Sequence, residues 1–348
     1  MTTRPFARFV AASGLTNLAD GIATVAWAWL ASLLTRDPLL IALVAVALRL
    51  PWFLFAIPAG VITDRVDRRL LILRMDMLRG LAFGFAALSI WFALPLAPAT
   101  MDLTQPGLYA AILVAATLVG IAEVFRDNAA QTMLPALVPQ DSLEKANGRL
   151  WSVELVGNAL LGPALGAFLI AAALPLPFAA GALAYMIAVV LVLAVKGEFK
   201  PAVTEARDWR RELCEGFHFL WRAQLLRSLA WITGVWNLLF QMVMIALVLH
   251  VQENLGLDAR AYGLILAAGA VGGIAGGWWG DAIITKVGPK RAAQWMLLAS
   301  FPSFLGIAYA PGPIALALVL AAFEFTGLVW NTVSVSYRQR KIPDALLG

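Results

Sequence analysis

Charged residues are scarce in this chain of 348 amino acids. Only 14% of the residues are charged, 61% are hydrophobic, and the mean hydropathy is +0.81. A soluble domain is about half apolar and about a quarter charged, so a soluble enzyme could not hide this much apolar surface. A disordered chain is excluded by the same numbers. The composition therefore predicts an all-α polytopic membrane protein.

Cysteine and histidine are also scarce. The single cysteine, Cys214, cannot form an internal disulfide, and only two histidines are present. These residues are too few for a His/Cys metal site, and the sequence has no Gly-x-x-x-x-Gly-Lys-Ser/Thr loop to bind nucleotide phosphates. We therefore expect neither an enzyme nor a bound cofactor or metal. If the protein transports a compound, we expect a proton gradient to drive the transport.

Long apolar runs fill most of the sequence instead. A membrane-spanning helix needs about 20 apolar residues, and turn residues, many of them proline, separate ten such runs. The predicted spans are residues 9–34, 39–63, 70–94, 107–137, 150–172, 176–195, 226–251, 261–284, 291–310 and 313–337.

The basic residues gather in alternate connections between these spans. If the N-terminus is cytoplasmic, most of the 26 lysines and arginines fall on the inner side, as in residues 64–79 and 196–227. This asymmetry predicts a multi-pass protein of the cell (plasma or inner) membrane. The basic residues form no single face, which argues against a nucleic-acid partner. The expected partners are the lipid bilayer and a small-molecule substrate, and the oligomeric state is not predicted.

The longest connection divides the chain after six predicted spans. We expect an N-terminal six-helix bundle over 1–196, a cytoplasmic linker over 197–225, and a C-terminal bundle of four helices over 226–348. Within the linker, the apolar residues Leu213, Phe217, Leu220 and Trp221 recur at helical spacing opposite charged positions. This pattern is typical of an amphipathic helix on the inner membrane surface.

A charged motif lies between the second and third spans. It reads Gly60-Val-Ile-Thr-Asp64-Arg65-Val-Asp67-Arg68-Arg69. The glycine allows close helix approach, and Asp64 can hold an arginine or cap a helix end across the bundle, as a latch that breaks when the bundle rocks. The alternative is ordinary inner-side positive charge in a tight turn. The predicted gating residues are Gly60, Asp64, Arg65, Arg68 and Arg69.

A second motif lies in the fifth span. Gly157, Gly162, Pro163 and Gly166 are small or helix-bending residues that permit close packing and a kink. With both motifs, the chain resembles the major facilitator superfamily. The stretch from Leu134 to Pro139 makes it similar to the branch that contains the enterobactin exporter and related multidrug exporters. The resemblance implies a major facilitator fold and export of a small compound.

The sequence departs from the family in two ways. The family usually has 6+6 helices, whereas 6+4 are predicted here. An internal match between the segments ending at Pro139 and Pro343 suggests that two helices of the second half are missing. The counterpart loop, residues 285–291, also lacks the aspartate. A non-transporting membrane component or a truncated, non-functional fragment is therefore the alternative to a transporter.

Ionisable residues inside spans cost about 2.5–3.5 kcal/mol each and are candidates for function. Asp20 lies about 18 Å along its helix from Arg8, and Arg49 lies about 24 Å from Arg65, so their depths differ by about 6 Å. We expect Asp20 and Arg49 to pair, with Asp20 exchanging a proton; a purely structural pair is the alternative. The proton-coupling candidates are Asp20, Arg49, Glu123 and Glu324.

Polar stripes occur on the first, fourth, seventh and tenth spans, which the resemblance places around the central cavity. The predicted cavity-lining residues are Asn17, Thr24, Asp127, Gln131, Asn237, Gln241 and Asn331. Trp27, Trp52 and Trp236 are candidates for an aromatic cavity wall. Asp76 and Arg79 are expected to form a local pair. The sequence predicts a secondary active transporter that exports a small amphipathic compound, drug-like or siderophore-like, by proton-coupled alternating access.

Overall fold

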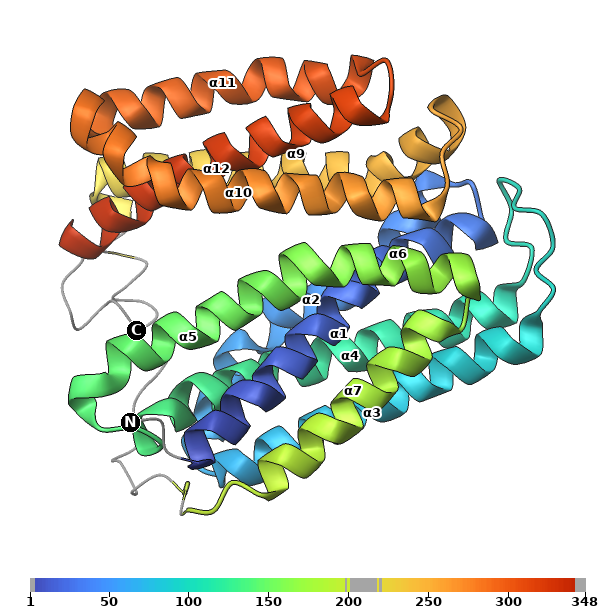
Figure 1. Ribbon diagram of the computed structural model, residues 1–348, viewed down its shortest axis with the longest axis horizontal. Helices are drawn as coiled ribbons and strands as arrows, with labels where there is room; N and C mark the ends of the chain where they lie inside the picture. The colour runs from blue at the N-terminus through green and yellow to red at the C-terminus, as the bar shows by residue number, and fades with distance from the viewer. Residues whose placement is uncertain (1–3, 198, 201–217, 219–220, 342–348) are drawn as a thin grey trace. The chain divides into compact units, whose positions relative to one another are not determined.

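The computed structural model describes residues 4–197, 199–200, 218 and 221–341. Within these residues every regular element is a helix, so the predicted all-α class is confirmed (Figure 1). Of the predicted amphipathic helix of the linker, Leu213, Phe217 and Leu220 lie outside the described residues, and Trp221 is helical and exposed.

Long helices follow one another along the chain. Their bounds are α1 (Arg4–Leu34), α2 (Pro38–Thr63), α3 (Arg68–Ala93), α4 (Pro106–Met133), α5 (Leu143–Glu154), η3 (Leu155–Leu161), α6 (Gly162–Ala172), α7 (Leu176–Leu193), α9 (Gln224–Leu249), η4 (His250–Asn254), α10 (Ala259–Val287), α11 (Pro289–Tyr309) and α12 (Pro313–Lys341). Two short 3-10 turns, η1 (Leu134–Ala136) and η2 (Gln140–Ser142), join α4 to α5.

Each predicted span corresponds to one helix, or to one continuous series of helical segments. Of the helices in the described ranges, eight are long and apolar enough to cross a membrane, with α5, η3 and α6 together forming one of them. The helices α3 and α11 are not among the eight. In α3 the apolar run is interrupted by Arg74, Asp76 and Arg79.

Capping residues in the sequence mark the first turns of α2 and α3, close to where the apolar runs begin. The side chain of Asp37 accepts a hydrogen bond of 2.8 Å from the Leu39 amide and caps α2, and Pro38 takes the first position of that helix. Asp67 caps α3 in the same way, with 2.9 Å to the Leu70 amide. These caps satisfy amides that have no partner inside the helix.

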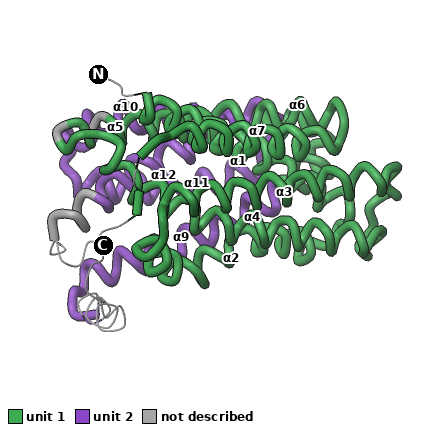
Figure 2. Tube along the Cα trace, turned by 90° about the horizontal axis from the view of Figure 1, so that it is seen from below, with its two compact units in different colours: residues 1–203, 248–264 green, residues 204–247, 265–348 purple. Residues whose placement is uncertain are grey.

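The chain divides into two compact units, which Figure 2 shows in green and purple. Unit 1 comprises residues 1–203 and 248–264, and unit 2 comprises residues 204–247 and 265–348. This division differs from the predicted one, because residues 248–264 fall in unit 1. In unit 1 the Gln252 amide donates 2.8 Å to Ser32 Oγ, and Tyr262 packs beside Trp29.

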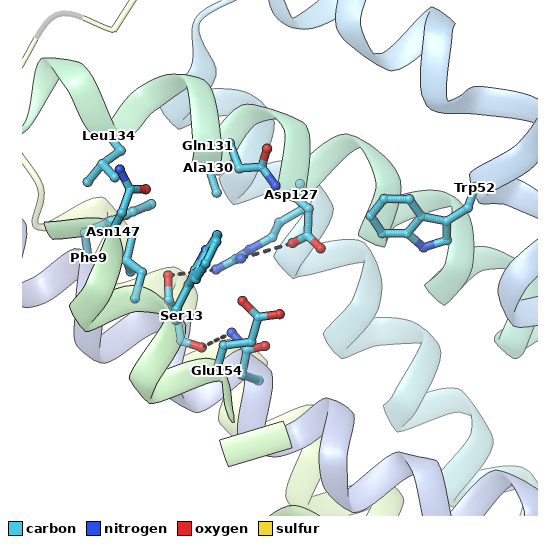
Figure 3. A pocket seen from close by; sticks show the side chains of 13 residues that line it. Phe9, Ser13, Trp52, Asp127, Ala130, Gln131, Leu134, Asn147 and Glu154 are labelled. Atoms are coloured by element: carbon cyan, nitrogen blue, oxygen red, sulfur yellow. Dashed lines mark hydrogen bonds and ion pairs between the residues drawn. The ribbon is translucent and has the colours of Figure 1, made fainter. Parts of the chain in front are cut away.

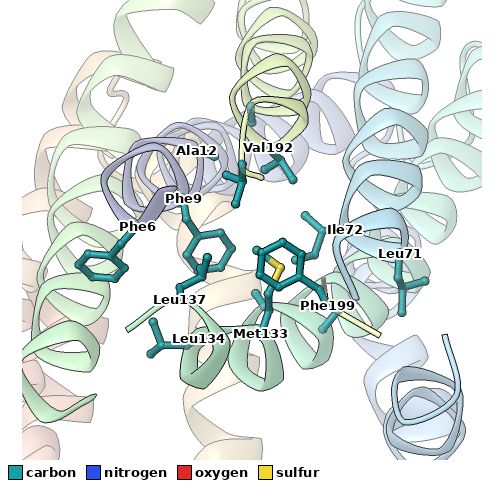
Figure 4. Close-up of a cluster of buried hydrophobic side chains, with 14 of the residues drawn as sticks. Phe6, Phe9, Ala12, Leu71, Ile72, Met133, Leu134, Leu137, Val192 and Phe199 are labelled. Carbon is teal, nitrogen blue, oxygen red and sulfur yellow. The ribbon is translucent and has the colours of Figure 1, made fainter. Parts of the chain in front are cut away.

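A hydrophobic cluster stabilises one end of unit 1 (Figure 4). Phe6 and Phe9 of α1, Ile72 of α3, Met133 of α4 and Val192 of α7 meet there and are buried. Burying one large apolar side chain stabilises a soluble protein by about 1.5–3 kcal/mol, and within a bilayer the same contacts contribute packing energy. The cluster holds together the ends of α1, α3, α4 and α7.

The glycines of the fifth predicted span allow α1 to approach closely. A Cβ at Gly162 would lie 2.5 Å from Gly21 Cα, and a Cβ at Gly166 would lie 2.5 Å from the Ile22 carbonyl oxygen. The π-helical segment η3 contains Gly157 and ends directly before Gly162 and Pro163, and such a segment is a known cause of helix bending. Close packing and a helix irregularity therefore occur at the motif.

Candidate functional site

A polar pocket of about 230 Å³ lies inside unit 1, among α1, α2, α4 and α5 (Figure 3). Its walls are Phe9, Ser13, Asn17, Trp52, Arg126, Asp127, Ala130, Gln131, Leu134, Asn147, Leu150, Trp151 and Glu154. The set contains two tryptophans, two carboxylates and one guanidinium. Such a pocket can hold an apolar ring and a polar group at the same time.

Three predicted cavity residues, Asn17, Asp127 and Gln131, line this pocket, and so does Trp52. Thr24 does not line it; the Thr24 hydroxyl donates to the Asp20 carbonyl oxygen one turn earlier. The polar stripe on α1, which runs from Asn17 to Thr24, therefore extends beyond the pocket.

The positively charged group in the lining set of this pocket is Arg126. Its NH1 lies 3.2 Å from Asp127 Oδ1, its NH2 donates to Ser13 Oγ at 3.3 Å, and its Nε lies 3.5 Å from Asp76 Oδ1. Arg126 and Asp76 are both buried. One guanidinium thus joins a pocket carboxylate to a carboxylate behind the pocket.

The predicted pair between Asp20 and Arg49 is wrong. Asp20 Oδ1 accepts hydrogen bonds from Arg79 of α3 and from the Tyr185 hydroxyl of α7. Arg49 lies 3.9 Å from Glu123 Oε1 of α4 and is 65% exposed. The physical reason is packing, because α1 packs mainly on α6 and α7, whereas α2 packs mainly on α4.

The expected local pair between Asp76 and Arg79 is also wrong. Although they are three residues apart on α3, Arg79 forms its ion pair with Asp20, and Asp76 forms its ion pair with Arg126. The Arg79 guanidinium also lies 4.5 Å from the centre of the Tyr185 ring. Because α3 packs between α4 and α7, these two side chains reach partners on neighbouring helices.

The charged motif after α2 binds the ends of other helices. Arg68 NH1 donates 3.0 Å to the Thr132 carbonyl near the end of α4, and Arg69 Nε donates 3.1 Å to the Val192 carbonyl near the end of α7. Asp64 lies 4.0 Å from Arg68. These arginines complement the partial negative charge of helix C-termini.

The other two motif residues make fewer contacts. Arg65 is exposed, and a Cβ at Gly60 would have one neighbour, the Asn128 amide nitrogen at 4.0 Å. Whether the motif gates the protein stays a prediction.

The candidates of unit 2 are spread along α9 and α12. Asn237, Gln241 and Asn331 are exposed, and Asn237 donates 2.8 Å to the Thr233 carbonyl of its own helix. Glu324 is half-buried, and its Cγ would lie 3.4 Å from a Cβ at Gly269 on α10. Among the residues the structure describes, Glu324 has no ion-pair partner.

Two of the three candidate tryptophans belong to aromatic clusters away from the pocket. Trp27 packs edge-on against Phe83 and Phe178 in unit 1. Trp236, Phe240 and Phe323 form a three-ring cluster in unit 2, in which the Trp236 centroid lies 5.3 Å from each phenylalanine and the two phenylalanines lie 5.6 Å apart. Of the three, Trp52 lines the polar pocket.

With the fold and this geometry described, the chain can be compared with known proteins. A sequence model for the Major Facilitator Superfamily matches residues 9–346. The chain belongs to the Major Facilitator Superfamily. The family resemblance is thereby confirmed, and membership of this family indicates a membrane transporter.

The multidrug efflux pump Tap of Mycolicibacterium fortuitum is 26% identical to this chain over 358 residues. The match covers 99% of this chain and 81% of that relative. The branch prediction therefore agrees with a relative whose name describes efflux.

Solved structures of low identity share the fold. The nucleoside transporter NupG has a TM-score of 0.74 at 12% identity, covering 99% of this chain and 84% of its own. A bacterial homologue of the iron transporter ferroportin in the inward-facing state has a TM-score of 0.72 at 17% identity, covering 98% and 85%. These likenesses confirm the predicted fold class.

Besides Phe9, Arg126, Ala130, Leu134 and Leu150, four further lining residues lie outside the predicted cavity set: Ser13, Asn147, Trp151 and Glu154. The sequence interpretation placed Glu154 near the inner surface and treated it as structural. Three of the four belong to α5, whose first turns are polar and give no stripe opposite an apolar face. A signal existed for Ser13, which stands four residues before Asn17 on the same helical face.

Proposed function

We propose that this transporter exports a small amphipathic compound in exchange for protons, with one cavity that opens alternately to the two sides of the membrane. The observation that carries the proposal is the position of Asp20. Its carboxylate lies in the middle of a predicted span, is 20% exposed and is paired with Arg79. Ser13 and Asn17 of the same helix line the pocket.

The Asp20 carboxylate has an ionised and a protonated form, and the two forms differ in their ion pairs. Ionised, Asp20 is held by the Arg79 guanidinium and the Tyr185 hydroxyl. Protonated, it releases Arg79, which is buried and must find another negative partner. Binding and release of one proton therefore changes the ion pairs between α1, α3 and α7, which is what a coupling site requires.

The composition of the pocket supports an amphipathic substrate. Trp52 and Trp151 offer aromatic faces, and Asn17, Asp127 and Gln131 offer polar groups. Ligand pockets for drug-sized molecules measure about 300–1,000 Å³, so a pocket of about 230 Å³ suits a small compound or one part of a larger one. Drug-like and siderophore-like compounds both fit this description.

The direction of transport is inferred from two features. The relative from Mycolicibacterium fortuitum is named as an efflux pump. The motif from Gly157 to Gly166, which resembles that of export members, packs directly against α1 next to Asp20. We propose further that the protein lies in the cell membrane with its N-terminus cytoplasmic, because most basic connections then face inward.

The test is accumulation of a panel of fluorescent amphipathic compounds in cells that express the protein, with and without a protonophore. We expect at least one compound to accumulate less in expressing cells, and the protonophore to abolish the difference. Asp20→Asn should abolish it as well, whereas Asp102→Asn, in an exposed loop, should not. Undiminished proton-driven efflux in Asp20→Asn would remove Asp20 from the coupling role.

A further inference from the structure

Five charged side chains form an alternating series through unit 1. Asp20 pairs with Arg79, and Arg126 pairs with both Asp76, at 3.5 Å, and Asp127, at 3.2 Å. Asp76 and Arg79 stand three residues apart on α3 and interact electrostatically. The order along the series is acid, arginine, acid, arginine, acid.

The middle carboxylate of this series has unusual surroundings. Asp76 is 0% exposed, and neither of its oxygens accepts a hydrogen bond within the described residues. A buried carboxylate without hydrogen bonds costs stability, and it is held by the charges of Arg79 and Arg126 on its two sides. It can therefore shift from one arginine to the other without breaking a hydrogen bond.

We propose that Asp76 is a positioning residue that passes the protonation state of Asp20 to Arg126, and thereby controls how strongly Asp127 binds a positively charged substrate group in the pocket. This inference rests on the proposed function, because it takes Asp20 as the proton site. The substrate class it implies is an amphipathic compound with one positive charge.

The steps follow from the ion pairs. When Asp20 is ionised it holds Arg79, so Asp76 and Asp127 share Arg126, as they do in the structure. The charge of Asp127 is then only partly compensated, and a cation can bind beside it. When Asp20 is protonated, Arg79 turns to Asp76, and Arg126 moves onto Asp127. The cation then loses its counter-charge in the pocket and is released.

Charge balance gives the same result. Three carboxylates face two guanidinium groups in the series, which leaves one negative charge in excess. An uncompensated charge is costly away from water. Either a proton on Asp20 or a cation beside Asp127 balances the series, so the two exclude each other.

Four further titratable or charged groups face the series from neighbouring helices: Arg49 of α2, Glu123 of α4, Glu154 of α5 and Tyr185 of α7. Arg49 and Glu123 form their own pair at 3.9 Å. Tyr185 donates to Asp20, and Glu154 adds a second carboxylate to the pocket wall. Together they leave the pocket side of the series negative, which favours a cation.

The test measures binding of tetraphenylphosphonium, a monovalent amphipathic cation, to the purified full chain by calorimetry between about pH 5.5 and about pH 8.5. One linked proton changes an affinity by at most about tenfold per pH unit, and we expect wild-type affinity to fall by about tenfold or more across this range as the pH decreases. In Asp76→Asn, Arg126 has only Asp127 left, so binding should be weak and should change by less than about twofold.

For a double variant, Asp76→Asn with Arg126→Gln, we expect tight binding of the cation, in contrast to the weak binding expected for Asp76→Asn alone. It removes both members of the buried pair, which proteins often tolerate, so it carries the test if the single variant does not fold. Asp127 then has no internal partner, and we expect tight binding without pH dependence. Asp76→Glu keeps the charge and should restore the wild-type slope, and Asp102→Asn should leave it unchanged.

Three results would overturn the proposed role of Asp76, which we call the relay. The first is a wild-type dependence of affinity on pH in Asp76→Asn, and the second is binding in the double variant that is no tighter than in Asp76→Asn. The third is wild-type binding that is absent or independent of pH. The variant Asp20→Asn separates the relay from the proposed function. A wild-type slope in Asp20→Asn rejects Asp20 as the proton site. A flat profile in Asp20→Asn together with a wild-type slope in Asp76→Asn rejects the relay alone.

Discussion

Replacing Gly162 with alanine is expected to force α1 and α6 apart. The added Cβ would lie 2.5 Å from Gly21 Cα and 2.6 Å from the Gly157 carbonyl oxygen. Optimal contacts between carbon atoms are about 3.5–4.0 Å, so the helices must separate by about 1 Å. Both neighbours are backbone atoms, which cannot rotate away as a side chain can.

The loss of stability expected for Gly162→Ala depends on the backbone atoms that the added Cβ must displace. Overpacking costs about 1–3 kcal/mol, and contact with backbone on two sides puts Gly162→Ala at the upper end of that range. Asp20 immediately precedes Gly21, so the same displacement moves the carboxylate relative to Arg79. We therefore expect a loss of thermal stability together with a loss of efflux.

The assay is thermal unfolding of the purified protein followed by tryptophan fluorescence, beside efflux in cells. Gly148→Ala is the matched control, because a Cβ at Gly148 in α5 meets nothing within 4 Å. In the control, alanine should stabilise the helix by about 0.5–1 kcal/mol. Equal unfolding temperatures for the two variants would show that close backbone packing at Gly162 is not what holds α1 in place.

Three further predictions test other contacts. Arg69→Ala removes two hydrogen bonds to the carboxyl end of α7 and should lower stability by about 1–3 kcal/mol, whereas exposed Arg65→Ala should change it by less than about 0.5 kcal/mol; equal unfolding temperatures would contradict this. Gly272→Ala would place a Cβ against backbone of α12 and should reduce the yield of folded protein, while Gly273→Ala, with its nearest contact at 3.9 Å, should not; equal yields would reject the close packing. Glu324→Gln should leave the unfolding temperature within about 2 °C of wild type, because Glu324 has no ion pair to lose within the part of the chain that the structure describes, and a larger decrease would reveal a structural partner.

The helices could be predicted from sequence because their signals are local. The second predicted span, residues 39–63, agrees with α2 (Pro38–Thr63) to within one residue, since Asp37 and Pro38 mark its start. The stripe that joins Asn17 to the pocket also follows from helical periodicity alone. Both predictions use spacing along one helix and need no knowledge of its neighbours.

Ion pairs could not be predicted in this way, because a pair depends on which helices touch and how each is rotated. Asp20 and Arg49 lie at similar depths along their helices, but α1 packs mainly on α6 and α7, whereas α2 packs mainly on α4. Arg49 reaches Glu123, and Asp20 reaches Arg79. Similar depth is necessary for a pair, but it does not select the partner.

Charge balance among the residues inside the spans limits which ion pairs can form. A buried arginine needs a counter-charge, and the carboxylates near Arg126 in the fourth predicted span are Glu123 and Asp127. If Glu123 pairs with Arg49 and Asp127 serves the pocket, Arg126 requires a further carboxylate from another helix. Asp76 is such a carboxylate once Arg79 is assigned to Asp20, and the structure has that pairing. Balancing every charge within the spans, rather than pairing residues by depth or by adjacency, would therefore have favoured the series that links the proposed proton site to the pocket.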